Sequence, residues 1–572
     1  MALAAIALVS CKDKNDDPQP QPDPRRESDC MIVGNIITMD EENPTAQAVV
    51  VKNGIIQFVG DRDEAKKYCT DQTTVLKFDS SFIYPGFMEG HVHGMLVAER
   101  LQQLDLSSLD EQQGTKMADF LAAIAQYVKD NPSKEIYKGS GWSVKDVEPT
   151  AAMLDAVCST KPIILTSVDG HSAWINTTAI EQFHLADPAN IEKYGTNYIR
   201  VDEKGYPTGY ISEGATNLVR EALTLTKDEY KAGLLQWQQK AFSLGITACT
   251  EAALLPNSPI IDAYHELAKS GDWKLRTYAV ERIPYTKDEK QFEAALEAAR
   301  KHSILYNSEY FKVSGIKIFV DGIVEAQTAW FIEPYAHDNQ YYGVPAFPDA
   351  DLIAKAVAFA NTNNMNAHFH TIGDAAVRTA VKGIVQAQQQ TGITEARNTL
   401  SHLEVVQPEE LNLIGLHNII PVVAPLWVPM DKEYYDYLKQ YLGTDRLNKQ
   451  YPIKSFFEKG CKVNFHSDYP VSPSFNVPQT IYAAVMRTLP MCEDFGAQNI
   501  NEAITREQAL QAFTTNVAYQ FKQENRMGKL KAGFVANMSV FDADFLKDDL
   551  NKVFNAQTVA TIVDGQAVYE QK

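Results

Sequence analysis

The stretch PGFMEGHVHG, residues 85–94, places two histidines one residue apart, directly after a Pro-Gly turn and a short apolar run. Residues two apart on a β-strand point to the same face, so His91 and His93 project side by side if a strand ends here. Such a pair is suited to metal binding, whereas a chance spacing among the twelve histidines is the alternative. The rest of the chain has to decide between these interpretations.

The composition describes a folded protein with an acidic surface. The chain has 572 residues, of which 45% are hydrophobic and 22% charged, and this is typical of a globular protein rather than a disordered one. Its 73 acidic and 53 basic residues give a net charge of −20. This charge argues against a nucleic acid or an anionic membrane surface as a partner and favours a small-molecule substrate. A monomer and a homodimer both remain open.

The start of the chain differs from the rest. An apolar run over residues 2–10 is too short to span a bilayer and ends in Leu-Val-Ser before Cys11. The pattern resembles a bacterial lipobox, although no Lys or Arg precedes the run, and a chance apolar start is the alternative. We expect a signal peptide over 1–10, lipid on Cys11, and a membrane-anchored lipoprotein of a Gram-negative cell envelope, either periplasmic or surface-exposed.

Residues 11–29 are charged and rich in proline without apolar periodicity, so we expect a disordered tether that spaces the folded part from the lipid. The membrane would then be contacted only through the lipid anchor. The seven cysteines form no CxxC pair, and we expect packing residues rather than a disulfide framework.

Short apolar strands broken by Asn-Gly and Gly-Asp turns fill residues 30–84, as in MIVGNIITMD and AQAVVVKNGIIQFVGD. Residues 525–572 contain similar strands in GKLKAGFVANMSVFDAD and TVATIVDGQAVYEQ. We therefore expect the two chain ends to pair into one small β-sandwich beside a central domain.

Apolar strands alternate with helical stretches over residues 85–524, which is the pattern of a parallel α/β fold. Together with the strand that ends at His91, seven candidate strands make eight, at 245–252, 273–282, 313–322, 364–374, 398–405, 418–425 and 461–469. Eight such units predict a closed (β/α)8 TIM-like barrel whose active site lies at the C-terminal ends of the strands.

The connection from about residue 96 to 240 is too long for a single βα loop and contains strands of its own, so it predicts an inserted subdomain. His171 follows one of these strands, in a segment that could fold back over the barrel mouth and face the substrate. A loop histidine that bonds locally is the alternative.

Residues with metal-binding or catalytic chemistry fall at the predicted strand ends. They are His91 and His93 on the first strand, Lys317 on the fourth, His370 on the fifth, His402 on the sixth and Asp468 on the eighth. The C-terminal ends of barrel strands meet at one face, and this coincidence favours a joint site over chance.

A resemblance to a known family rests on motifs that occur in order after residue 29. They are PGFMEGHVHG, GSGW, DGHSAWIN, GYPTGYISEGA, KIFVDG with a following EPY, HFHTIGDAA, SHLEVVQPEE, HSDYPV and GKLKAGFVANMSVFD. By these motifs the sequence resembles the amidohydrolase superfamily, within it the YtcJ-like branch called amidohydrolase family 3, which includes N-substituted formamide deformylases. The resemblance implies a distorted barrel with one or two divalent metals, usually zinc, on His91, His93, Lys317, His370, His402 and Asp468.

The resemblance also implies that Lys317 reacts with CO2 to give a carbamate anion that bridges two metals. A bare ammonium would be repelled by the metal cations, and a buried lysine with a lowered pKa is prone to carboxylation. The segment IKIFVD places Lys317 and Asp321 on one face of a strand, so an ion pair between them is the alternative.

The expected activity is metal-dependent hydrolysis of a carbon–nitrogen bond other than a peptide bond, in an amide, formamide or cyclic amide. Asp468 would take a proton from a metal-activated water and pass it to the leaving group, and a second metal or His171 would polarise the carbonyl. Asp468 as a simple helix N-cap is the alternative. Lactone or ester hydrolysis, isomerisation, and a non-catalytic lipid-anchored binding protein also remain open.

Several further residues are assigned from their positions. Trp142, Trp330 and Trp427 lie near predicted loops or strand ends and suggest an aromatic substrate pocket shared with His171, with ordinary core packing as the alternative. We expect His368 to line the barrel and His466 to narrow the pocket. Glu89 stands where the family usually has Asp, and it could perturb the surroundings of His91.

Overall fold

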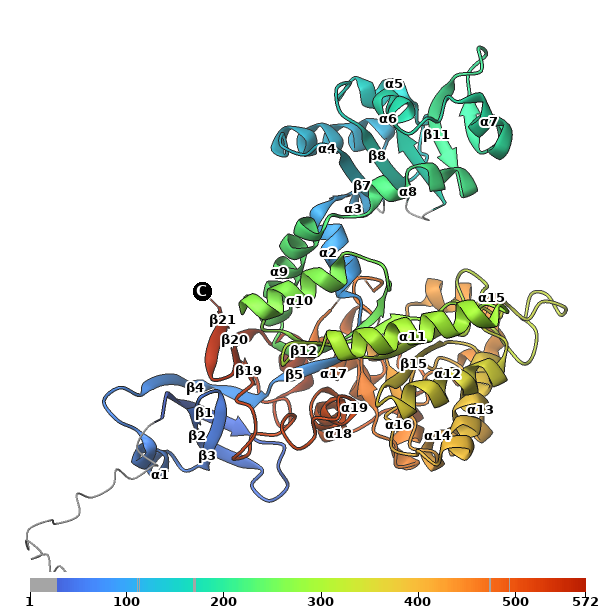
Figure 1. The fold of residues 1–572 in the computed structure, drawn as a ribbon. Coiled ribbons are helices and arrows are strands. Elements are labelled where there is room, and N and C mark those ends of the chain that lie inside the picture. The colour runs from blue at the N-terminus through green and yellow to red at the C-terminus, as the bar shows by residue number, and fades with distance from the viewer. Residues whose placement is uncertain are drawn as a thin grey trace, which may run out of the picture.

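The computed structural model describes residues 28–571 except 111, 113, 168–170, 473–474 and 493. The predicted signal peptide, Cys11 and nearly all of the tether lie outside the described residues. Three sheets organise the described part of the chain, one of eight strands, one of seven and one of six (Figure 1). Among the described residues, no helix combines the length and the apolar composition that crossing a membrane requires.

The central sheet confirms the predicted TIM-like barrel. Consecutive strands pair in parallel, so all their carboxyl ends lie at the same edge. The strands are β5 (Phe87–Val92), β12 (Ile246–Leu254), β13 (Arg276–Arg282), β14 (Phe311–Phe319), β15 (Asn366–Thr371), β16 (Thr399–His402), β17 (Ile420–Val423) and β18 (Asn464–Phe465). All nine residues of β12 are buried, as expected of a parallel strand that is covered on both faces.

Helices surround the barrel (Figure 1). The main ones are α9 (Lys227–Ser243), α10 (Ile260–Ser270), α11 (Glu289–Leu305), α12 (Ala350–Thr362), α13 (Asp374–Thr391), α14 (Pro408–Leu416), α16 (Ile453–Glu458), α17 (Val477–Met486), α18 (Arg506–Phe513) and α19 (Thr515–Gln520). Local sequence fixes where several begin: Thr226 and Glu229 form a capping box at the start of α9, and Asp349 caps α12.

The last strand lies beside the first and nearly closes the barrel. The Asp468 amide donates to the His91 carbonyl at 3.3 Å, and the His93 amide donates to the Tyr469 carbonyl at 2.9 Å. Gly90 permits this approach, because a Cβ at that position would lie 2.9 Å from the Phe465 carbonyl oxygen. The backbone contacts that close the barrel are therefore made by three of the predicted metal ligands and their direct neighbours.

Both chain ends contribute to the seven-stranded sheet. Its order is β21 (Gln566–Glu570), β20 (Thr558–Val563), β19 (Met538–Phe541), β4 (Thr74–Pro85), β1 (Cys30–Ile37), β2 (Thr45–Lys52) and β3 (Ile55–Gly60). Ile56 of β3 and Ile562 of β20 share one core although their strands are far apart in this order, so the sheet curls around that core. The expected sandwich of both ends is thus built as one curled sheet rather than two separate ones.

The inserted domain holds the six-stranded sheet. Its strands run in the order β10 (Ile199–Val201), β11 (Pro207–Ser212), β9 (Ser172–Ile175), β8 (Ile163–Ser167), β7 (Tyr137–Trp142) and β6 (Leu104–Asp105), with α4 (Met117–Asp130) among its helices. It is joined to the barrel through α2 (Gly94–Gln102) and α9. The two helices can pack closely because Gly233 has no side chain; a Cβ at this position would lie only 2.5 Å from the Ala98 carbonyl oxygen.

The sequence leads us to expect the segment around His171 to fold back over the barrel mouth, and the structure corrects this. Figure 1 shows the inserted domain standing away from the barrel at the end of the α2 and α9 pair. The domain also has cores of its own, formed around Ile164 and around Phe120, so its packing does not depend on contact with the barrel.

Arg276 at the start of β13 joins the barrel to the C-terminal strands. Its side chain is 2% exposed, and its Nη2 lies 2.6 Å from Asp564 Oδ1 and 3.2 Å from Glu309 Oε1. Its Nη1 donates to Asn537 Oδ1 at 3.3 Å. Asn537 also accepts the Asp564 amide through the same oxygen, so this buried network ties three segments together.

We predict that Arg276→Ala lowers the free energy of unfolding by about 3 kcal/mol, because it leaves the partly buried carboxylate of Asp564 without its cationic partner. The measurement is chemical denaturation followed by fluorescence and circular dichroism. Arg526→Ala is the matched control, since Arg526 also pairs with Glu309 but has a side chain that is 47% exposed. Equal small effects of the two substitutions would contradict the structural role of Arg276.

Candidate metal centre

The residues predicted from strand ends lie at the carboxyl edge of the barrel, and all six are buried. They are His91, His93, Lys317, His370, His402 and Asp468. β5 supplies His91, β14 supplies Lys317, and the other side chains come from the ends of β15 and β16 or the turns after β5 and β18. The parallel pairing of the strands is what brings side chains so distant in sequence to one edge.

The shortest contacts in this group are made by Asp468. Its Oδ1 lies 3.0 Å from His91 Nε2 and 3.3 Å from His93 Nε2. His91, His402 and Asp468 each offer a ligand atom, and these atoms lie within 4.8 Å of one another. Two imidazoles and one carboxylate at this spacing match the ligands that zinc prefers.

His91 and His402 are neutral. Burial lowers the pKa of His91 well below its usual value, and the nearby Lys317 lowers it further. Burial, followed by the neighbouring His370, does the same to the pKa of His402. Burial alone would raise the pKa of Asp468, but the contact with His93 and the nearby ring of His402 hold it well below its usual range. Asp468 is therefore ionised at neutral pH.

Orphaned atoms show that the donor set fits a divalent cation. Within the described part of the chain, His91 Nε2, Asp468 Oδ1 and both ring nitrogens of His402 have no hydrogen-bond partner. Buried polar atoms are rarely left unpaired, and His91 Nε2, Asp468 Oδ1 and one ring nitrogen of His402 can each offer a lone pair. A metal ion would satisfy these three atoms together.

A layer beneath the cluster orients His91. Its Nδ1 lies 2.7 Å from His368 Nε2 and 2.9 Å from Ser401 Oγ, which leaves Nε2 to face Asp468. His368 Nδ1 in turn lies 2.6 Å from Thr399 Oγ1. His368 thus lies inside the barrel behind a ligand, and fixing the ring of a ligand in this way is a common feature of metal sites.

Lys317 is fully buried beside the cluster. Its Nζ has no hydrogen-bond partner among the described residues, and burial lowers the pKa of Lys317 to about 7 although Asp468 acts to raise it. The alternative ion pair with Asp321 is not formed. Asp321 instead accepts the amides of Trp330, Ile372 and Gly373 at 3.0, 3.0 and 2.8 Å.

His370 and His466 flank the cluster without joining its closest group. His370 Nε2 lies 3.1 Å from the Gly322 carbonyl oxygen, and its ring centre is 4.4 Å from that of His402. The ring of His466 lies 5.1 Å from His91 and 5.0 Å from His402, and neither of its nitrogens has a hydrogen-bond partner among the described residues. Burial lowers the pKa of both rings to about 4, so both are neutral.

Glu89 acts on Asp468 rather than on His91, the neighbour expected from the sequence. Its Oε2 accepts the amide of Ser467 at 2.9 Å and the Ser467 hydroxyl at 3.1 Å. Burial raises the pKa of Glu89 to about 8. Glu89 therefore fixes the turn that carries Asp468.

Two of the candidate ligands have a left-handed backbone. His402 has φ +77° and Asp468 has φ +57°, a conformation that costs a residue with a side chain about 1 kcal/mol or more. The ring of Trp427 stacks on His402, with ring centres 5.2 Å apart and an interplanar angle of 5°, and the Trp427 indole donates to Ser472 Oγ at 2.6 Å. Packing thus holds His402 in this conformation.

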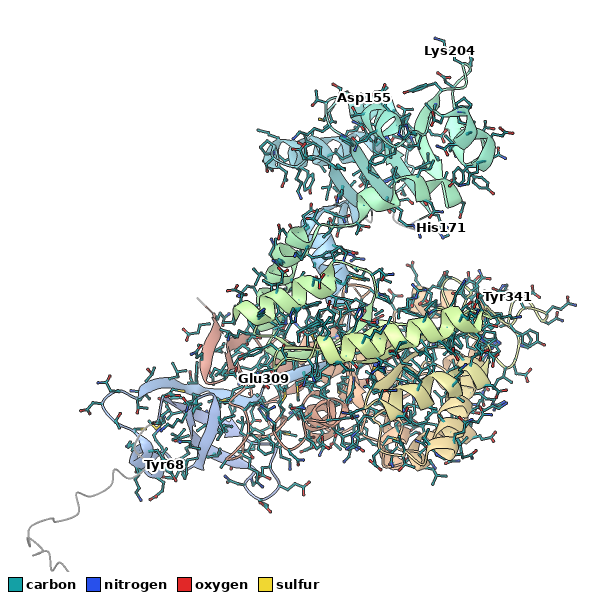
Figure 2. All side chains as sticks on the ribbon, in the orientation of Figure 1. Tyr68, Asp155, His171, Lys204, Glu309 and Tyr341 are labelled. Atoms are coloured by element: carbon teal, nitrogen blue, oxygen red, sulfur yellow. The ribbon has the colours of Figure 1, made fainter. Side chains whose placement is uncertain are left out.

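The other residues predicted to contact substrate lie elsewhere. Trp142 is 1% exposed in the core of the inserted domain, where its indole donates to the Leu165 carbonyl at 2.8 Å, so it serves packing. Trp330 is half-buried against the barrel core. His171 has a side chain that is 66% exposed, with Nδ1 3.3 Å from Glu213 Oε1. Figure 2 shows it at the edge of the inserted domain, apart from the barrel, so it does not reach the cluster in this arrangement.

Glu325 and Glu404 were missed by reasoning from the sequence. Both line a cavity beside Trp427. Glu404 follows His402 by two residues within the motif SHLEVVQPEE, and this position could have indicated a place near the site.

Comparison with known proteins shows similarity along nearly the whole chain. The profile of the amidohydrolase family matches residues 81–569. YtcJ of Bacillus subtilis is 24% identical over 547 residues, covering 94% of this chain and 98% of its own. The N-substituted formamide deformylase of Arthrobacter pascens is 24% identical over 576 residues, covering 95% and 98%.

A solved structure is similar in fold. An uncharacterised metal-dependent hydrolase from Pyrococcus furiosus has a TM-score of 0.71 and 22% identity, and the match covers 91% of this chain and all of that one.

Proposed function

The chain belongs to the amidohydrolase family of metal-dependent hydrolases, and on this premise we propose that it cleaves a carbon–nitrogen bond other than a peptide bond in a small molecule. The bond would belong to an amide, a formamide or a cyclic amide. The observation that carries the proposal is the group of His91, His402 and Asp468, whose unpaired ligand atoms converge at the carboxyl edge of the barrel. The similarity to a formamide deformylase supports this bond class.

We propose zinc as the metal. His91, His402 and Asp468 would hold one ion, and His93, His370 and Lys317 lie beside them as donors for a second ion. A divalent ion bound there would act as a Lewis acid and would lower the pKa of a water molecule bound to it toward neutrality. The buried, neutral histidines keep their lone pairs available for this purpose at neutral pH.

Asp468 is the general base of the proposed reaction. Its carboxylate is ionised at neutral pH, so it can accept the proton of the attacking water and return it to the leaving nitrogen. His93, 3.3 Å from Asp468 Oδ1, and the turn held by Glu89 keep this carboxylate in place. His171 takes no part, because the inserted domain holds it apart from the cluster (Figure 2).

Lys317 is proposed to carry a carbamate. Its unprotonated Nζ would attack CO2 and lose a proton, which replaces a buried amine by an anion next to the metal ligands. A pKa of about 7 leaves a large fraction of the amine unprotonated at neutral pH, and Asp321 is engaged elsewhere and leaves Nζ free to react.

We expect about two zinc ions per chain when zinc and bicarbonate are supplied, and one or none for Lys317→Ala. The measurement is elemental analysis of the purified full chain. Lys312→Ala is the matched control, because Lys312 lies on the same strand but away from the cluster, and it should keep the full metal content. An equal metal content in Lys317→Ala and the control would refute the carbamate, and no metal in any variant would refute the metal centre.

Asp468→Asn should lower kcat/KM about 1,000-fold, since it removes the proton acceptor while keeping the size of the side chain. Activity is measured on a panel of amides, formamides, lactams, lactones and esters, with the products identified. Asp445→Asn, at an exposed position on a surface helix, is the control. Hydrolysis of esters or lactones but of no amide or lactam would overturn the proposed bond class, and unchanged activity in Asp468→Asn would overturn its role.

We further propose that the protein is anchored by lipid to the bacterial cell envelope. The support is the Leu-Val-Ser-Cys sequence that ends at Cys11 and the charged, proline-rich segment that follows it. Cys11→Ser should move the protein from the membrane fraction to the soluble fraction and abolish labelling by radioactive palmitate. Continued membrane association and labelling of Cys11→Ser would contradict the anchor.

A further inference from the structure

A cavity of about 340 Å³ lies beside the proposed metal centre. Eleven described residues line it, among them Glu325, Glu404, Trp427, Tyr434, Tyr451 and Ser472. Most of these residues follow the C-terminal ends of β14 to β18, and Tyr434 comes from α15 (Lys432–Leu447). The cavity therefore lies on the face of the barrel where substrate binds in this fold.

The cavity is connected to the metal centre by shared residues. Trp427, in its wall, stacks on His402, and Ser472, also in its wall, accepts the hydrogen bond of the Trp427 indole. Glu404 and Ile372 each lie two residues beyond a predicted ligand, His402 and His370. A substrate whose reactive bond lies at the metal centre could thus extend into this cavity.

The charge of the cavity is one-sided. Glu325 and Glu404 both line it, and the eleven described lining residues include no Lys, Arg or His. The described hydrogen-bond donors to these two carboxyl groups are neutral side chains. They are the Tyr434 hydroxyl for Glu325, and the Gln450 amide and the Tyr451 hydroxyl for Glu404. Glu404 is only 5% exposed, and burial, followed by the nearby charge of Glu325, raises the pKa of Glu404 well above its usual value. No cationic side chain of the described lining offsets this effect.

Aromatic rings complete the lining. Trp427, Tyr434 and Tyr451 all border the cavity, and the faces of such rings attract organic cations. Two carboxyl groups and three aromatic rings around a space of this size form a site that suits a cation and disfavours an anion.

We propose that this cavity binds an organic cation, an ammonium, amidinium or guanidinium group, at the end of the substrate away from the bond that is cleaved. The inference deepens the proposed function and rests on it where it assigns the cation to a substrate. The substrate is then an amide or formamide with a basic group, and the carboxylates recognise that group by charge-assisted hydrogen bonds. Substrates with a carboxylate at the same place are rejected.

The test measures binding of benzamidinium to the full-length, zinc-supplied protein by calorimetry, with benzyl alcohol as a neutral aromatic of similar size. We expect benzamidinium to bind about tenfold more tightly than benzyl alcohol. Glu404→Gln and Glu325→Gln should each reduce this preference about threefold or more. Glu433→Gln is the matched control, because Glu433 is an exposed residue of α15 that is not part of the described lining, and it should keep the preference.

Glu404→Gln and Glu325→Gln are each compared with the wild type by circular dichroism and by melting temperature, so that a loss of binding caused by misfolding can be recognised. Equal binding of benzamidinium and benzyl alcohol by the wild type would overturn the proposal. It would also be overturned if benzamidinium bound equally well to the wild type and to both glutamine variants, because binding would then occur elsewhere.

The cation site and the proposed hydrolase function can fail independently, and the experiments distinguish the two cases. A cation preference that depends on Glu325 and Glu404, together with no hydrolysis of any amide, would refute the proposed function and leave the cation site in place. Hydrolysis of neutral amides in preference to amides of similar size with a cationic group would support the proposed function and refute the cation site.

Discussion

The barrel closes where β18 meets β5, and this contact requires that no side chain stand between them. Gly90 meets that requirement, because a Cβ there would come within 2.9 Å of the Phe465 carbonyl oxygen. The same contact brings the Asp468 amide to the His91 carbonyl and so places Asp468 Oδ1 beside two histidine rings. The proposed metal centre thus depends on barrel closure, since its carboxylate and two of its histidines lie in or just after the last and first strands.

The centre combines buried donors with few internal partners. Neutral imidazoles and an ionised carboxylate approach each other without hydrogen bonds, while His368, Ser401 and Glu89 hold them from behind. Such an arrangement costs free energy in the folded chain because buried polar atoms stay unpaired. The cavity beside Trp427 follows the same principle, with two carboxyl groups that have no cation among the described lining residues. Buried atoms without a hydrogen-bond partner therefore mark the proposed chemistry, and carboxyl groups without a nearby cation mark the proposed specificity.

Much of this site could be predicted from the sequence, because the strand periodicity sets where residues such as His91 and His402 point and parallel strands gather them at one edge. The position of the inserted domain could not be predicted, since it depends on how α2 packs on α9 rather than on any local pattern. For the same reason Trp142 and His171 were expected near the substrate, although one packs in a separate core and the other is exposed. The cavity carboxyl groups also escaped prediction, because Glu325 lies in a loop whose path only the tertiary structure defines.

The curled sheet joins strands from the first and last parts of the chain, with Ser539 opposite Tyr84. During synthesis β4 is made long before β19. The edge of β4 and the apolar face around Ile83 therefore stay uncovered until more than four hundred further residues have been synthesised. The N-terminal strands form one core by themselves, around Met31, but their face around Ile83 is completed only by C-terminal residues, and the nascent protein has an open strand edge for most of its translation. Completion of the sheet is consequently one of the last folding events, and it makes the finished C-terminus a condition for a stable N-terminus.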